Sequence, residues 1–343
     1  MSWQEKLNGD PLPWLLDPSE PNVRYLALRD LLDRPADDPD LLAAQELAHQ
    51  QGPISTILAE MYPEGYWVKA GPGYGPKYRS SVWSLILLGQ LGAWADCDPR
   101  IERACQYLCE HALSQNGQFS YNGAPGGTID CLQGNLCAAL LDLGFTDPRL
   151  DKAFEWMART VTGEGMALQG DKSTPLRYYA YKCGPVFACG ANDKQPCGWG
   201  AVKVMLALGK LPRDKRIPLI QQAIERGAEF LLGVDPASAA YPTVGNIKPN
   251  TSWWKFGFPV FYVTDLLQNA EALVRLGYGA DPRLRPALDL IQAKQDASGR
   301  WNLEYDYTGK TWLDFGPKKT PNKWVTLRAL WVLSHARMEE REK

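Results

Sequence analysis

Residues 131–147 read CLQGNLCAALLDLGFTD, and the chain continues as PRLDKAFEWMART to residue 160. The first part is apolar almost all round and ends in Leu-Gly, whereas the second opens with Asp-Pro-Arg and has one charged face. A helix that is apolar all round is buried, and a helix with a charged face lies at the surface. Gly ends the first helix, and Asp caps the second with Pro in its first turn. This stretch therefore predicts an inner helix followed by an outer helix.

The same pair recurs along the chain. Apolar helices are expected to end at Asp33, Gly92, Gly144, Gly209, Gly277 and Ser334, which are 59, 52, 65, 68 and 57 residues apart. Amphipathic helices are expected from Asp98, Asp147, Arg213 and Asp281, with one outer helix supplied by residues 41–62. A period of this length has to be interpreted before local structure. It predicts an all-α fold, an (α/α)6 toroid in which six inner and about six outer helices enclose a central cavity.

Length and composition agree with one large domain. The 343 residues are 45% apolar, and the repeat predicts a single domain over 1–343, with an arm at 1–20 and a polar tail at 336–343. A net charge of −2 with interspersed signs gives no footprint for nucleic acid or an anionic membrane. The first residues lack the pattern of a signal peptide, and no apolar run is long enough to span a bilayer. Eight cysteines are then expected as thiols in a cytoplasmic protein.

The linker after the last outer helix contains Gln295-x-x-x-Gly299-x-Trp301. Related linkers at 63–70, 114–121 and 162–168 place glycine before an aromatic or apolar residue. QxxxGxW resembles the repeat motif of the squalene cyclases, whose α/α toroid is shared with protein prenyltransferase β subunits. The resemblance covers nearly the whole chain as repeat architecture, although only one copy keeps the motif in full. It implies an enzyme for an isoprenoid or other hydrophobic substrate, while Gln295 and Trp301 themselves are expected to stabilise the ring.

Functional residues are expected where the inner helices begin, because their free N–H groups and positive dipole ends converge there. Alignment on the terminal glycines places Cys131, Cys197 and Asp265 at nearly the same level of three consecutive inner helices. Two thiolates and a carboxylate from neighbouring helices can hold zinc. Cys183 lies in a glycine-rich loop before the fourth inner helix and is a further candidate ligand. Buried thiols without a metal are the alternative.

The resemblance makes a zinc site plausible, because prenyltransferases hold zinc with Asp, Cys and His in such a toroid. The cysteine spacings match no common zinc motif. Histidine also departs from the family pattern, since His49 and His111 fall on outer helices and His335 at the far end of the last inner helix. The source of a fourth ligand is therefore open.

A second interpretation of the same rim uses an acid. Squalene cyclases protonate an alkene with an aspartic acid from a DxDD motif at the start of an inner helix, and Asp130 has the corresponding place in GGTIDCLQGN. This chain has no DxDD and no DDxxD, so the resemblance to the family is incomplete here. The alternative role of Asp130 is a helix cap. Asp265 has three candidate roles: metal ligand, acid or cap.

The cavity lining predicts an apolar or planar ligand. Aromatic faces stabilise carbocations, and they also stack on sugars. Basic side chains at the same end are suited to a diphosphate or a carboxylate. The predicted substrate contacts are Arg79, Trp83, Trp199, Lys203, Phe258, Tyr262 and Trp324.

Three function classes follow. The preferred one is a terpenoid cyclase-like or prenyltransferase-like enzyme that uses a thiolate-held metal or an aspartic acid. A non-catalytic toroid that binds a hydrophobic ligand is the first alternative. The second is an (α/α)6 glycoside hydrolase or lyase, which needs two carboxylates across the cavity. For that role the candidates are Asp193, Asp265, Glu304, Asp306 and Asp314. The motifs predict no protein partner and no oligomeric state.

Overall fold

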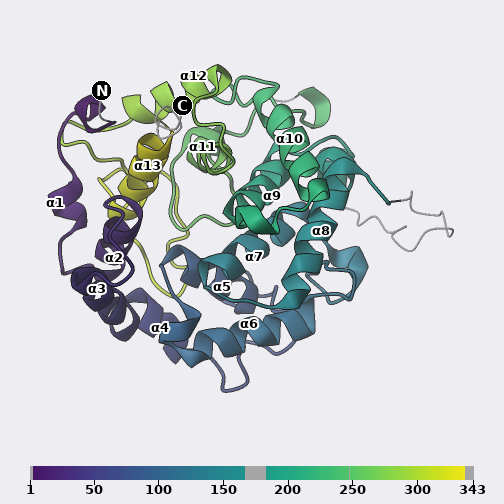
Figure 1. Ribbon diagram of the computed structural model, residues 1–343, viewed down its shortest axis with the longest axis horizontal. Coiled ribbons are helices and arrows are strands. Elements are labelled where there is room, and N and C mark those ends of the chain that lie inside the picture. The colour runs from purple at the N-terminus through teal and green to yellow at the C-terminus, as the bar shows by residue number, and fades with distance from the viewer. Residues whose placement is uncertain (1–2, 167–182, 247, 337–343) are drawn as a thin grey trace.

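A computed structural model describes residues 3–166, 183–246 and 248–336. Within these ranges the chain is an all-α toroid, with an inner ring of helices surrounded by an outer ring (Figure 1). The inner helices are α2 (Pro21–Asp30), α5 (Ser81–Gln90), α7 (Asp130–Asp142), α9 (Gly198–Lys210), α11 (Leu266–Arg275) and α13 (Lys323–His335). The outer helices are α3 (Pro39–Gln50), α4 (Pro53–Ala59), α6 (Pro99–Ala112), α8 (Pro148–Thr162), α10 (Pro218–Leu232) and α12 (Arg285–Ala293). The predicted fold class is confirmed.

Short helices complete the described parts of the chain. The N-terminal arm contains η1 (Trp3–Lys6) and α1 (Leu12–Leu15). Single 3-10 turns lie in the linkers: η2 (Ala95–Cys97), η3 (Pro125–Gly127), η4 (Pro185–Phe187), η5 (Gly190–Asn192), η6 (Arg213–Lys215), η7 (Val244–Asn246), η8 (Thr251–Trp254) and η9 (Pro282–Leu284). No described helix is long and apolar enough to cross a membrane.

The outer helices begin with the caps that the sequence predicts. Asp98 and Asp147 each accept a hydrogen bond from the backbone N–H two residues later. In both copies the arginine of Asp-Pro-Arg also pairs with the capping carboxylate, at 2.6 Å for Asp98 and 2.7 Å for Asp147. Each cap satisfies an amide that has no partner inside the helix. The repeated tripeptide is therefore a helix start and carries no evidence of a site.

Two boundaries differ from the prediction. Residues 41–62 contain most of α3 and all of α4 rather than one helix. The break occurs because Gly52 has a φ of +74° and Pro53 starts α4. A proline in the first turn is compatible with a new helix but not with continuation of the old one. The region after Asp281 similarly begins as η9 before α12 starts at Arg285.

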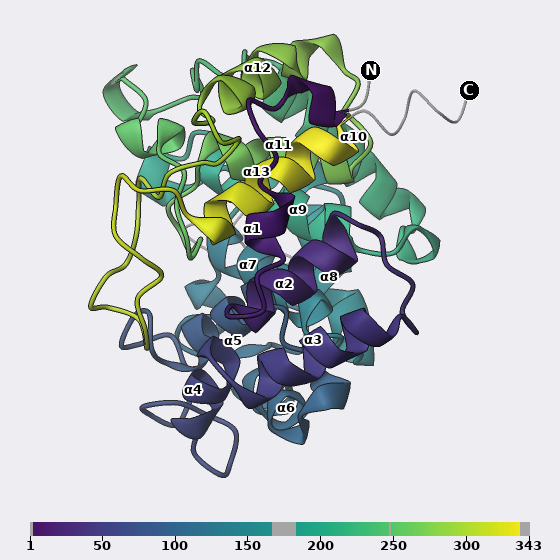
Figure 2. The ribbon, with the colours of Figure 1, turned by 90° about the vertical axis from the view of Figure 1, so that its left-hand side faces the viewer.

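The ring closes without a covalent link, through the N-terminal arm. Helices α2 and α13 lie side by side in both views (Figures 1 and 2). Gln295, after α12, accepts a hydrogen bond from the Asn8 amide at 2.7 Å and donates to the Lys6 carbonyl at 3.2 Å. Gly299 has a φ of +72°, and a Cβ on it would lie 2.4 Å from the Gly9 carbonyl oxygen. The QxxxGxW linker therefore joins the last repeat to the arm.

The tryptophans of the linkers anchor the outer helices to the inner ones. Trp301 and Trp67 are fully buried, and each indole N–H donates to a carbonyl ten residues earlier at 2.7 Å. Their backbone N–H groups donate to Thr326 and Ser81, which lie on the next inner helix. The same arrangement in the linker at 63–70 and in the last linker shows that the motif is structural, as expected for Gln295 and Trp301.

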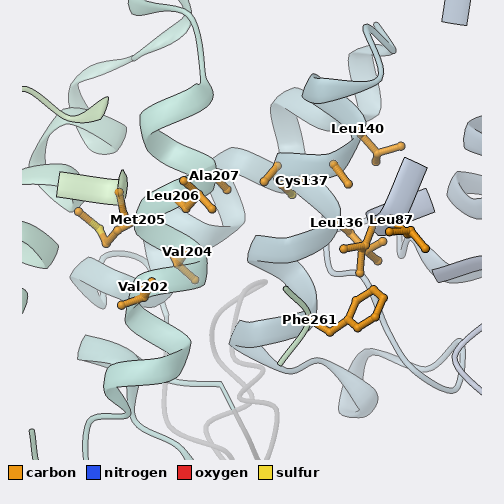
Figure 3. Close-up of a cluster of buried hydrophobic side chains, with 14 of the residues drawn as sticks. Leu87, Leu136, Cys137, Leu140, Val202, Val204, Met205, Leu206, Ala207 and Phe261 are labelled. Atoms are coloured by element: carbon orange, nitrogen blue, oxygen red, sulfur yellow. The ribbon is translucent and has the colours of Figure 1, made fainter. Parts of the chain in front are cut away.

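The core lies between the inner helices. Helices α7 and α9 pack against each other, and Figure 3 shows Leu136 of α7 on the side that faces Leu87 and Phe261. Gly134 allows this approach, because a Cβ on it would lie 2.4 Å from the backbone of Lys203. Close packing at this density makes the ring wall rigid.

We expect Trp301→Ala to lower the free energy of unfolding by about 3–5 kcal/mol, because it leaves a cavity and removes the link between α12 and α13. Urea denaturation followed by circular dichroism measures the change. Leu42→Ala, at an exposed position on α3, serves as the control and should change stability by less than about 1 kcal/mol. Equal effects of the two substitutions would contradict the anchoring role.

Candidate functional site

A loop of the chain, residues 256–262, passes through the inside of the ring; we call it the inner loop. Gln90 at the end of α5 forms two hydrogen bonds with the backbone of Val260, both at 2.8 Å. Asn135 on α7 donates to the Phe261 carbonyl, and Arg328 on α13 donates to the Gly257 carbonyl at 2.6 Å. Side chains of three inner helices thus satisfy a backbone that would otherwise be buried without partners. The inner loop is therefore held inside the ring by hydrogen bonds to its backbone.

Asp130 is the first residue of α7 and is 2% exposed. The Cys183 thiol donates to its Oδ1 at 2.5 Å, whereas Oδ2 has no hydrogen-bond partner among the described residues. Burial raises the pKa of Asp130 to about 8, and the Cys183 hydrogen bond opposes this by favouring the carboxylate. At neutral pH the group is therefore a carboxylic acid with a hydroxyl that no described residue accepts.

Three further cysteines gather beside this acid. Cys189 and Cys197 flank a short antiparallel contact between Ala188 and Pro196, and their thiols are hydrogen-bonded to each other. Cys131 lies close enough to interact electrostatically with Cys189 and Asp130, and its burial raises its pKa to about 12. The hydrogen bond that Cys197 makes with Cys189, together with burial, likewise raises the pKa of Cys197. Cys131 and Cys197 are therefore neutral thiols at physiological pH.

Lys203 on α9 is fully buried next to the same cluster. Its ammonium nitrogen donates to Gln268 Oε1. Burial lowers the pKa of Lys203 to about 7, partly offset by Cys131 and Asp265. We call Asp130, Cys131, Cys183, Cys189, Cys197 and Lys203 the acid–thiol cluster. Sequence analysis had named five of these six residues as site candidates, and the structure brings them together.

Asp265 has a different environment. It caps α11 by accepting the Gln268 amide at 2.7 Å, and Arg328 donates to both of its oxygens at 2.9 and 3.0 Å. The carboxylate is therefore engaged by a cap and a bidentate ion pair rather than by the thiols. This is the capping role that sequence analysis kept open for Asp265.

The described donor groups do not form a metal site. Over residues 3–166, 183–246 and 248–336, no group of three or more His, Cys, Asp or Glu side chains is arranged to hold a metal ion. Cys183 donates a proton to Asp130, which is a thiol's role and not that of a thiolate ligand. We derive no step through zinc, and the zinc site stays a prediction of the sequence.

Aromatic side chains form a second cluster at the N-terminal end of α5. Trp83 contacts Phe261 and Tyr262 edge-on, with ring centroids 5.5 and 5.1 Å away. The Lys77 ammonium lies 5.7 Å from the Tyr74 ring centre and 5.5 Å from that of Tyr262. The faces of these two tyrosines therefore already accept a cation. Tyr262 also interacts electrostatically with Cys131, which links the aromatic cluster to the acid–thiol cluster.

The other predicted substrate contacts are scattered. Arg79 is exposed and donates to the Thr311 carbonyl at 3.2 Å, while its guanidinium lies over Trp312. Trp199 is half-buried at the start of α9. Phe258 and Trp324 are buried and stacked, with centroids 4.5 Å apart. The structure does not bring these four together with Trp83, Lys203 and Tyr262 as one lining.

A cavity of about 140 Å³, which we call the central cavity, lies where the inner helices end, whereas the sequence predicted the site at their N-terminal ends. All six inner helices contribute to it, and so does Phe258 of the inner loop. Lys210 pairs with Asp142, and Arg275 pairs with Glu271 at 2.9 Å. The available signal was the charged residue in the last turn of otherwise apolar helices. These two ion pairs are part of the lining, which is therefore less apolar than the sequence suggested.

Comparisons with known proteins leave the family open. No protein-family model and no curated protein matches the chain. A protein from Actinoplanes of solved structure is 16% identical, with 86% of this chain and 99% of that chain covered and a TM-score of 0.30. Two structures of type II terpene cyclase MstE from Scytonema are also similar. The complex of a variant with its substrate, geranylgeranyl dihydroxybenzoate, is 13% identical, with 86% and 96% coverage and a TM-score of 0.32. The apo form is 15% identical, with 87% and 99% coverage and a TM-score of 0.28. TM-scores this low carry no conclusion about fold or function.

The pKa of Asp130 predicts how stability depends on pH. Because the folded pKa, about 8, exceeds the unfolded value of 3.8, the folded state holds a proton that the unfolded state releases. As the pH rises between these two values, the free energy of unfolding should therefore fall by about 1.4 kcal/mol per pH unit. Asp130→Asn should remove this slope. Urea titrations of both proteins at pH 5, 6 and 7 measure it. A difference between the two proteins that does not change with pH would contradict the prediction.

The zinc prediction is tested by elemental analysis of protein purified without added metal or a histidine tag. A zinc site at these thiols would give about one zinc per chain, lowered in both Cys131→Ala and Cys197→Ala while the circular dichroism spectrum is retained. Cys105→Ala, at a buried position on α6, is the matched control and should keep the metal. Absence of zinc, or its full retention in both rim variants, would show that the thiols do not ligate it.

Proposed function

We propose that this chain is a terpenoid cyclase-like enzyme that acts on an isoprenoid or other hydrophobic substrate, with Asp130 as the acid. The observation that carries the proposal is the unpartnered Oδ2 of Asp130, in a carboxyl group that is buried at the start of an inner helix. Buried polar atoms are nearly always hydrogen-bonded, and an exception calls for an explanation. A role of this carboxyl group as proton donor to a substrate atom would explain the exception.

The surroundings of Asp130 support this role chemically. Burial keeps the carboxyl protonated at neutral pH, whereas the Cys183 thiol stabilises the carboxylate that forms when the proton leaves. The reaction would transfer the Oδ2 proton to one carbon of an alkene, so that the π electrons form the new C–H bond and the other carbon becomes a cation. Loss of a proton from the product cation to a base would end the reaction and, through solvent, restore the acid. No metal takes part in these steps.

The aromatic cluster suits the positive charge that such a reaction creates. Tyr74 and Tyr262 place their faces around the Lys77 ammonium, and a carbocation would interact with the same negative ring faces once the exposed Lys77 side chain has moved away. The interaction contributes about 2 kcal/mol or more when the ring is shielded from water. Tyr262 lies in electrostatic reach of Cys131, the neighbour of the proposed acid.

The two alternatives differ in what they require. A non-catalytic toroid would bind the same hydrophobic ligand and leave Asp130 without a chemical role. A glycoside hydrolase needs one carboxylic acid and one free carboxylate across a cavity. Glu304 pairs with Lys294 at 2.8 Å, Asp306 with Lys318 at 3.3 Å, and Asp265 with Arg328. These pairings favour structural roles for the three carboxylates, so we rank the glycosidase last.

We expect Asp130→Asn to lower the turnover of a reactive polyene by at least about 100-fold, because the amide has the same shape but no acidic proton. Squalene and geranylgeraniol in detergent micelles are the probes, and gas chromatography with mass spectrometry detects cyclised products. Asp151→Asn, at an exposed position on α8, is the control and should retain activity.

Undiminished turnover in Asp130→Asn would remove Asp130 as the acid. Binding of both polyenes by the unmodified protein without any product would overturn the catalytic proposal and favour the non-catalytic toroid. Cys183→Ala separates the thiol's contribution, since it should slow turnover while leaving Asp130 in place.

A further inference from the structure

A cavity of about 410 Å³ lies where the first and last repeats meet, and we call it the seam cavity. Its walls come from the arm and α2 on one side and from residues 313–316 and α13 on the other. Trp324 lines it, whereas the stacked partner Phe258 lines the central cavity, so this ring pair separates the two. The volume falls within the range of small-molecule sites. None of the acid–thiol cluster belongs to its lining.

Asn22, near the start of α2, provides a buried acceptor at this cavity. It is 2% exposed, and its amide nitrogen donates to the carbonyls of Ala48 at 3.4 Å and Leu91 at 3.1 Å. These two acceptors fix the orientation of the amide, because a flip would direct oxygen at oxygen. Asn22 Oδ1 has no hydrogen-bond partner among the described residues. It faces Gly52, which also lines the cavity and whose Cβ, if present, would lie 3.4 Å away.

Donors lie on the same walls. Lys323, the first residue of α13, is 6% exposed, and its ammonium nitrogen lies 3.1 Å from Glu20 and 3.6 Å from Asp17. Pro21 starts α2 and Lys323 starts α13, and both residues line the seam cavity. The first turn of each helix carries backbone N–H groups without intrahelical partners. The cavity therefore combines a buried acceptor, a buried ammonium group and backbone donors.

The balance of charge selects the class of ligand. Glu20 and Asp314 on the walls disfavour an anion. Lys323 and the positive ends of two helices disfavour a cation. A neutral ligand with hydroxyl groups suits both, since each hydroxyl donates to an acceptor such as Asn22 and accepts from a donor such as Lys323.

Aromatic side chains complete the match. Trp14, Phe315 and Trp324 line the same cavity, with the Arg300 guanidinium 4.3 Å from the Trp14 ring centre and Phe258 stacked on Trp324. The apolar face of a sugar ring packs on aromatic rings that remain open to it. We propose that the seam cavity is a saccharide-binding site, separate from the proposed acid site and independent of it.

The test uses maltose and cellobiose as probes, with saturation-transfer NMR to detect binding and calorimetric titration to measure it. We expect at least one of them to bind the full chain, and Trp14→Ala and Lys323→Met each to weaken binding at least tenfold. Trp94→Ala is the matched control, since Trp94 is also a half-buried tryptophan but lies outside the seam cavity. Circular dichroism shows whether each variant is folded.

Lack of binding by both sugars would overturn the proposal, as would binding that neither seam variant weakens. Choline and inorganic phosphate serve as comparison ligands. Binding of either of them in place of the sugars, lost in Trp14→Ala or Lys323→Met, would assign the cavity to a cation or an anion and equally overturn it. If Lys323→Met does not fold, Trp14→Ala alone decides. Sugar binding does not require polyene turnover, so either proposal can fail without the other.

Discussion

The closed ring of apolar helices is the constraint on which the rest of the structure depends. Once six such helices face one another, every polar group inside the ring must find a partner there, because water is excluded. Gln90 meets both backbone groups of Val260, and Arg328 meets Asp265 and the Gly257 carbonyl. These contacts hold the inner loop across the ring. Burial thus determines both the packing of the interior and the charge state of the groups left in it.

The acid–thiol cluster shows how burial determines the charge state of a group. Asp130 and Lys203 are both buried, and burial alone pushes the pKa of the first up and that of the second down. At neutral pH Asp130 is then a neutral hydrogen-bond donor, whereas Lys203, with a pKa of about 7, is divided between ammonium and amine. A carboxylate and an ammonium in direct contact would have given opposite shifts. The separation of the two groups is therefore what preserves a protonated acid inside the ring.

The sequence predicts the ring well, because the ring follows from local patterns. Helix faces, Asp-Pro-Arg caps and terminal glycines each act within a few residues, and the pattern of an apolar inner helix occurs six times. The structural role of Trp301 was predicted for the same reason, since its indole N–H bonds to the carbonyl of Ile291, only ten residues earlier. The break at Gly52 was missed although its signal, the dipeptide Gly52-Pro53, is present in the sequence.

The site was less predictable, because its contacts are long-range. Cys183 meets Asp130 across 53 residues, and Arg328 meets Asp265 across 63. Alignment of helix ends correctly placed Cys131 and Cys197 at one level, but it carries no information about rotation of each helix about its axis. That rotation decides whether a side chain such as Asp265 faces a thiol or an arginine.

The way in which the ring closes also explains why a cavity lies at the seam. The last repeat has no outer helix of its own after α13 within the described residues, and the N-terminal arm supplies the missing contacts through Asn8 and Gln295. An arm of short turns cannot fill the groove between α2 and α13 as a full helix does. Two helix starts and the buried amide of Asn22 are left beside an unfilled volume. Consecutive inner helices from α5 to α13 pack against one another, whereas the seam between α2 and α13 leaves room for a ligand.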